Sequence, residues 1–134
     1  EELHTATGWR LKVVPGLIPV QDFFELLAAK RFCTSTWVRQ PHQLDYIEEP
    51  DMFHDTFGHI PPLLNRDFAA FMNRFGEIGV ALIRAGHDDA VLRLQRLYWY
   101  VVEFGFLKNS EVCEKQKELI YFDALRYIQG IRKG

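Results

Sequence analysis

The chain has 134 residues, of which 48% are hydrophobic and 25% are charged, and its formal net charge is −2. This length and apolar content are enough for one globular domain with a core, and they exclude a disordered or fibrous protein. Binding to nucleic acid or to an anionic membrane surface calls for a clustered basic excess, which this composition does not have. We therefore expect a small molecule as the partner, with no nucleic acid and no membrane.

The two cysteines, Cys33 and Cys113, are far apart and do not have the spacing of a disulfide framework or a thiolate zinc site. The sequence contains no apolar run near the roughly 18 residues of a membrane span. Residues 1–4 do not have the pattern of a signal peptide. We expect two reduced thiols and a cytoplasmic protein.

The first third of the chain has both extended and helical patterns. Residues 9–14 alternate weakly and end at the Pro-Gly turn signal of residues 15–16. Pro19 suits the first turn of a helix that runs to Lys30. Residues 34–39 are rich in β-branched side chains, which favours an extended segment.

A short helix is expected next. Residues 48–51, Glu-Glu-Pro-Asp, have the acids and the proline typical of a helix N-terminus. Gly58 and the prolines at 61–62 form a stop signal. His54 therefore lies inside this helix.

The remaining patterns are helical. Asn65 is a suitable N-cap for a long helix, which the Ala-Gly-His sequence of residues 85–87 ends. A second long helix is expected from Asp88 to Glu103, and residues 111–129 again have helical periodicity. The sequence thus predicts a mainly α fold with minor strand content.

Two histidines, His54 and His59, and one carboxylate, Glu103, are the main candidates for chemistry. Two imidazoles and one carboxylate are the ligands of a mononuclear non-haem iron(II) site that leaves positions open for dioxygen. On a regular α-helix, residues five apart point about 140° away from each other. Because Gly58 can adopt the left-handed conformation, we expect His59 to fold back toward His54.

Glu103 has large apolar neighbours three and four positions away on its helix: Trp99, Tyr100, Phe106 and Leu107. Such neighbours remove water from the carboxylate, so a cation partner is expected, and a divalent metal ion would serve. The alternative is an ion pair with Arg96 or Arg84, the histidines then lying at the surface or at helix ends. The residues by themselves leave both interpretations open.

The sequence PDMFHDTFGHIP of residues 50–61 closely resembles the signature of the tetrahydrobiopterin-dependent aromatic amino acid hydroxylases. Residues 98–105, YWYVVEFG, resemble the segment that carries the third iron ligand of that family. The resemblance covers about residues 7–107, and residues 39–41 and 44–47 look most like the bacterial phenylalanine 4-hydroxylases. It implies the helical catalytic domain of that family.

The resemblance implies that His54, His59 and Glu103 bind Fe(II), and that tetrahydrobiopterin or a related tetrahydropterin lies beside the iron and reacts with dioxygen. The residues that match the family's pterin site are Val14, Gly16, Leu17, Ile18 and Phe23. Without the resemblance, Phe23 would be interpreted as a core aromatic residue of its helix.

The resemblance also implies a substrate site. Arg39 matches the residue that binds the amino acid carboxylate, a task suited to its bidentate guanidinium. Asp51 matches the acidic residue that holds this arginine in position. The matched pocket walls are Phe32, Tyr46, Pro50 and Trp99. The alternatives are a surface ion pair for Arg39 and plain packing for the walls.

The implied activity is hydroxylation of L-phenylalanine to L-tyrosine, as in phenylalanine catabolism. Two alternatives stay open, a hydroxylase of tyrosine or tryptophan and a truncated, non-catalytic metal-binding or regulatory protein. The chain is about half as long as the family's catalytic domain, so residues 1–134 are expected to be a single partial domain. Residues 111–134 are then a helical tail without a clear family match, through which the protein could self-associate.

Overall fold

The structure, a computed structural model, describes residues 1–43 and 49–104. The chain divides into two compact units, residues 1–81 and residues 82–134. The described part is mostly helical with one small sheet, which confirms the mainly α prediction with minor strand content. A helix long and apolar enough to cross a membrane is not found among these residues.

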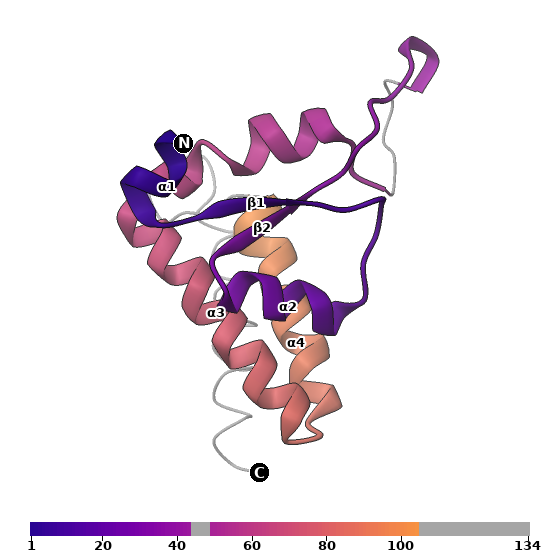
Figure 1. Cartoon of the computed structure of the whole chain (residues 1–134). Coiled ribbons are helices and arrows are strands. Elements are labelled where there is room, and N and C mark those ends of the chain that lie inside the picture. Colours follow the sequence, from indigo (N-terminus) through magenta and orange to yellow (C-terminus); the bar gives the residue numbers. More distant parts are fainter. Residues whose placement is uncertain (44–48, 105–134) are drawn as a thin grey trace, which may run out of the picture. The chain divides into compact units, whose positions relative to one another are not determined.

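The first unit contains a β-α-β arrangement. Strands β1 (Arg10–Val13) and β2 (Arg31–Thr34) lie side by side and run parallel, with Lys12 opposite Cys33 (Figure 1). Helix α2 (Val20–Ala28) makes the crossover that a parallel pair requires. Both the predicted first extended segment and the helix that follows it are confirmed, with slightly shorter bounds.

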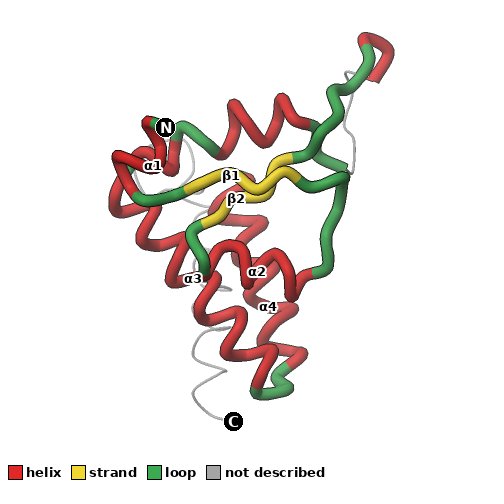
Figure 2. Tube along the Cα trace, in the orientation of Figure 1, coloured by secondary structure: helices red, strands yellow, loops and turns green. Residues whose placement is uncertain are grey.

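The prediction of an extended segment over residues 34–39 is wrong except at its first residue. The backbone N–H of Ser35 donates to the carboxylate of Asp55 at 2.7 Å, and that of Arg39 donates to Asp51 at 3.0 Å. These side chains therefore take backbone donors that a longer strand would give to a neighbouring strand. The chain leaves the sheet as a loop (Figure 2).

Three short helices were not predicted: α1 (Glu2–Thr7), η1 (Pro41–Gln43) and η3 (Pro62–Leu64). They have too few turns for an apolar period to show in the sequence. The hydroxyl of Thr7 donates to the backbone oxygen of Leu63 at 3.0 Å, which ties α1 to η3.

The long helix α3 (Arg66–Arg84) begins as predicted, and the boundary between the two units falls near its end. The side-chain oxygen of Asn65 accepts hydrogen bonds from the backbone N–H groups of Asp67 at 2.9 Å and Phe68 at 3.0 Å. These bonds satisfy two of the donors that a helix start leaves unpaired, so Asn65 is the N-cap.

Two glycines let α3 pack closely on α2. A Cβ added to Gly76 would overlap the backbone of Leu27 and Ala28, and one added to Gly79 would overlap the ring of Phe24. The buried apolar side chains of the first unit are Trp9, Val14, Phe24, Leu27, Phe32, Leu63, Ala69, Met72 and Phe75. The contact between α2 and α3 is thus part of the core that supports the sheet.

In the second unit, Gly86 adopts a left-handed φ of 70° between two helices. Helix α4 (Asp88–Tyr98) follows and continues directly into η4 (Trp99–Glu103), a π-helical segment. The predicted helix from Asp88 to Glu103 is therefore confirmed in extent, but its last turn is wider than an α-helical turn. The predicted tail helix lies outside the described residues.

Candidate metal centre

The two histidines lie at the ends of η2 (His54–His59), a π-helical segment. A π-helix joins residues five apart by its hydrogen bonds, so its first and sixth residues come close together. Among the described residues, positive φ angles occur at Gly8, Gly86 and Lys30, so the predicted left-handed conformation of Gly58 is wrong. The wider helical turn brings the histidines together instead.

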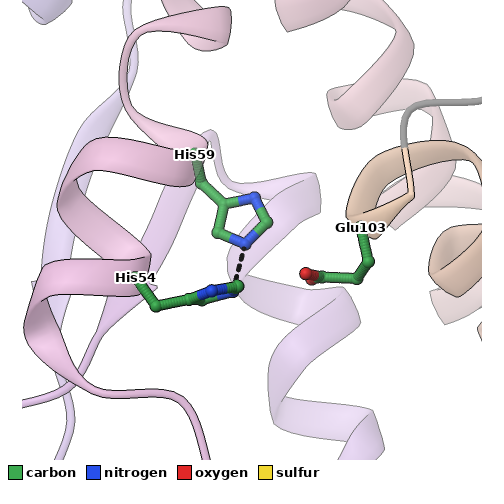
Figure 3. A group of neighbouring side chains, drawn as sticks. All are labelled: His54, His59 and Glu103. Carbon is green, nitrogen blue, oxygen red and sulfur yellow. Dashed lines mark hydrogen bonds between the residues drawn. The ribbon is translucent and has the colours of Figure 1, made fainter. Parts of the chain in front are cut away.

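The geometry of the histidine pair fits one metal ion. The Nε2 atoms of His54 and His59 are 3.0 Å apart, and the rings meet edge to face at 70° (Figure 3). Two nitrogen ligands at right angles on one ion, each about 2.1 Å from it, are about 3.0 Å apart. The pair therefore has the donor type and the spacing of two adjacent ligands.

Both histidines are held by other residues of the first unit. The backbone N–H of His54 donates to Asp51 at 3.0 Å. His59 is buried, and its ring packs against Phe32 of β2 with 5.0 Å between ring centres. One histidine is thus held through its main chain and the other through its ring.

Asp55, beside His54, is buried, and its carboxylate accepts the 2.7 Å hydrogen bond from the backbone of Ser35. Sequence reasoning missed Ser35 because a backbone donor leaves no signal in the sequence. Burial raises the pKa of Cys33 to about 11, and the negative charge of Asp55 adds to this effect. Cys33 therefore stays a neutral thiol near pH 7 and is a poor metal ligand.

Arg39 and Asp51 form a bidentate ion pair. Nε of Arg39 lies 3.0 Å from one carboxylate oxygen of Asp51, and Nη2 lies 3.1 Å from the other. Asp51 is fully buried, whereas the Arg39 side chain is 24% exposed, so the ion pair reaches from the interior toward the surface. The hydrogen bonds from Arg39 hold the pKa of Asp51 well below its usual range.

The residues matched to the pterin site all lie in the first unit: Val14, Gly16, Leu17, Ile18 and Phe23. Val14 is buried, and its backbone donates to Thr34 at 2.9 Å, whereas Leu17 is 73% exposed. Phe24 fills the core, and the half-buried Phe23 meets its ring edge to face. The structure therefore gives the role of fully buried core aromatic to Phe24.

The residues matched to the substrate pocket are distributed over both units. Phe32 is buried against a candidate ligand, as described above, and Pro50 is half-buried. Trp99 belongs to the second unit, is 46% exposed, and meets the ring of Phe104 edge to face. Tyr46 lies outside the described residues.

Glu103 is the last residue of η4, in the second unit, and it is half-buried. Its position at the end of a π-helical turn parallels that of His59 in η2. Both segments that carry candidate ligands thus depart from α-helical geometry, which is frequent at functional sites.

Comparison with known proteins identifies the protein family of this chain. The family model described as biopterin-dependent aromatic amino acid hydroxylase matches residues 1–122. The chain belongs to this family. The match extends beyond residue 108, near which the resemblance of the motifs ends, and into the segment interpreted as a tail.

Two bacterial relatives are phenylalanine-4-hydroxylases. The protein of Chromobacterium violaceum is 51% identical over 109 residues, which cover 81% of this chain and 36% of that protein. The protein of Ralstonia nicotianae is 52% identical over 109 residues, which cover 81% of this chain and 34% of that protein. The chain thus spans about a third of the length of these relatives.

Solved structures of the Chromobacterium violaceum enzyme have the same fold over 75% of this chain. The cobalt-bound structure has a TM-score of 0.69, 52% identity and 35% coverage of that chain. The structure with iron and phenylalanine has a TM-score of 0.64, 47% identity and 34% coverage. A third, with iron(III) and 7,8-dihydrobiopterin, has a TM-score of 0.66, 51% identity and 35% coverage.

Proposed function

We propose that this chain carries the metal centre of an Fe(II)- and tetrahydropterin-dependent monooxygenase that converts L-phenylalanine to L-tyrosine. The observation that carries the proposal is the 3.0 Å separation of the His54 and His59 Nε2 atoms, which suits two adjacent ligands of one ion. The family and the bound groups of the related structures support the choice of iron, pterin and phenylalanine.

We propose Glu103 as the third ligand. In this proposal, His54, His59 and Glu103 each offer one ligand atom to the same metal ion (Figure 3). A carboxylate with two imidazoles makes the facial set that non-haem iron oxygenases use. When bound, Fe(II) supplies open positions where dioxygen is activated, and the tetrahydropterin supplies electrons.

In this proposal, Arg39 binds the carboxylate of the amino acid substrate. A guanidinium has five N–H donors, of which Asp51 accepts two from the side chain of Arg39. The other three are enough for a second bidentate pair, with the substrate. Asp51 fixes the plane of the guanidinium and keeps its charge in place.

The apolar residues orient the two organic reactants. Phe23 and the backbone of residues 14 and 16–18 would hold the pterin when it binds. In this proposal, Phe32, Tyr46, Pro50 and Trp99 would hold the substrate ring and exclude water. Phe32 also packs on His59, so it supports the metal site as well.

Phenylalanine is favoured as the substrate because the bacterial relatives at 51% and 52% identity are phenylalanine-4-hydroxylases. A tyrosine 3-monooxygenase of Schistosoma mansoni is 37% identical over 110 residues. The alternative to an enzyme is a non-catalytic, metal-binding protein.

A turnover assay separates these functions. The protein is loaded with Fe(II) and supplied with dioxygen, a tetrahydropterin and L-phenylalanine, and tyrosine is measured together with pterin oxidation. We expect tyrosine formation that depends on all four additions and is weakened mainly in substrate affinity by Arg39→Ala. Bound iron without any hydroxylated product would favour the non-catalytic protein, and product from tyrosine alone would favour the tyrosine hydroxylase.

Two further expectations belong to this proposal. We propose that the protein acts in the cytoplasm and that it self-associates through residues 111–134. Sedimentation of the chain with and without these residues tests the second point. A monomer in both cases would contradict it.

A further inference from the structure

The carboxylate of Asp51 joins two parts of the proposed site. One oxygen, Oδ2, accepts hydrogen bonds from the backbone N–H and from Nε of Arg39, both at 3.0 Å. The other, Oδ1, accepts from Nη2 of Arg39 at 3.1 Å and from the backbone N–H of His54 at 3.0 Å. Three of these bonds come from Arg39, which is proposed to bind the substrate, and one comes from His54, which is proposed to bind the metal ion.

The burial of Asp51 makes its four hydrogen bonds costly to break. Asp51 is fully buried, so water cannot replace a lost partner, and an unpaired buried donor or acceptor costs about 1 to 3 kcal/mol. The backbone carbonyl of Asp51 also accepts from Asp55 at 3.1 Å, which anchors the start of η2 to the same residue. A displacement of η2 therefore moves Asp51, and with it the guanidinium of Arg39.

Asp55, the other buried carboxylate close to His54, has a different hydrogen-bond partner. Its carboxylate accepts the backbone N–H of Ser35 at the end of β2. It therefore anchors the same helical segment to the sheet, and it serves as a matched comparison for Asp51.

We propose that Asp51 is a positioning residue that couples the two binding events, so that a metal ion at the histidine pair strengthens binding of the amino acid substrate at Arg39. This inference rests on the proposed function. A metal ion that holds His54 fixes η2, and through Oδ1 it fixes the carboxylate plane to which the guanidinium fork is paired. Arg39 is then ordered before the substrate arrives, and less conformational entropy is lost when it binds. By linkage, the substrate strengthens metal binding by the same factor.

The test uses the whole chain with Co(II), which does not turn over the substrate, and L-phenylalanine. The Kd of Co(II) is measured by its visible absorption, with and without saturating phenylalanine, and the Kd of phenylalanine is measured by calorimetry with and without Co(II). In the wild type we expect both Kd values to fall by the same factor, about 10-fold, within the range of typical coupling. Equal Kd values with and without the other ligand would overturn the proposal before any variant is made.

The decisive variant is Asp51→Asn. An amide has one accepting oxygen and one donating nitrogen, so it cannot accept from Arg39 and from His54 on both sides at once. We expect the coupling factor to fall to about 1, while Co(II) still binds through the unchanged ligands. A coupling factor that stays at its wild-type value in folded Asp51→Asn protein would contradict the proposal.

Asp55→Asn is the control. It removes a buried carboxylate from the same helical segment but leaves the four bonds to the Asp51 carboxylate, so the coupling should persist. Loss of coupling in both variants would show a general loosening of η2 and would overturn the specific role of Asp51. If neither Co(II) nor phenylalanine binds the wild type, the proposed function fails as well, whereas normal binding of both without coupling refutes only this inference.

Discussion

The two π-helical segments that carry the proposed ligands differ in how they are buried. In η2 (His54–His59), Asp55 and His59 are buried. In η4 (Trp99–Glu103), the structure has no buried residue, and Trp99 and Tyr100 are 46% and 45% exposed. The first unit therefore holds two of the three proposed ligands. We expect the histidine pair to set where a metal binds, and Glu103 to set how tightly it binds.

The largest effect is expected from removal of one histidine. His54→Ala should weaken Co(II) or Fe(II) binding by more than about 100-fold, because partners that only orient a ligand already contribute about 10- to 100-fold. Metal content after dialysis and a Co(II) titration measure this effect. His42→Ala, which changes an exposed histidine of η1, is the control and should bind like the wild type.

A smaller effect is expected at the carboxylate. Glu103→Gln keeps the size of the side chain and one oxygen but removes the charge, so metal affinity should fall by about 10- to 100-fold. The metal affinity of Glu103→Asp should lie between those of Glu103→Gln and the wild type. Wild-type affinity in the Gln variant would mean that the histidines bind the ion without this residue.

Asp51 should affect stability as well as coupling. Removing one partner of a buried ion pair costs about 3 to 5 kcal/mol, and the lower end applies here because Arg39 reaches solvent. Since the folded pKa of Asp51 is lowered, its contribution is present above the ordinary pKa near 4 and is lost as the pH falls through the folded value. Denaturant unfolding between about pH 2 and pH 7 should show a smaller loss of stability on acidification in Asp51→Asn. Equal slopes in the two proteins would contradict this.

The core of the first unit can be tested at the contact between α2 and α3. Gly76→Ala places a methyl group against the backbone of α2 and should lower the free energy of unfolding by about 2 kcal/mol. Urea unfolding measures it. Weakened metal binding in the folded variant would show that the strain reaches η2, and unchanged binding would show that it stays in the core.

The smallest effect is expected at Gly58. A Cβ there meets no atom within 4 Å, and its φ is not positive, so Gly58→Ala should keep metal affinity and stabilise the helix by about 0.5 to 1 kcal/mol. A clear loss of metal affinity in Gly58→Ala would instead support a left-handed conformation at this position. Gly86→Ala, at a φ of 70°, is the contrasting variant and should destabilise the protein.

The long helices and their starts could be predicted because periodic apolar residues and the cap at Asn65 act locally. The bounds of β2 could not be predicted, because they depend on pairing with β1. They also depend on the backbone N–H groups after the strand, at residues 35 and 39, which donate to the carboxylates of Asp55 and Asp51. Motifs gave the candidate ligands, but a shift from α- to π-helical hydrogen bonds has no residue signature. The prediction that His59 lies close to His54 is therefore confirmed, whereas the predicted cause, a left-handed Gly58, is wrong.

The most direct test of the account is a crystal structure of the protein loaded with Fe(II) under anaerobic conditions. We predict one ion bound by Nε2 of His54, Nε2 of His59 and a carboxylate oxygen of Glu103, at about 2.0 to 2.2 Å each, with the remaining positions filled by water. An ion bound elsewhere, or bound by the histidines with the carboxylate of Glu103 directed away from it, would contradict the account.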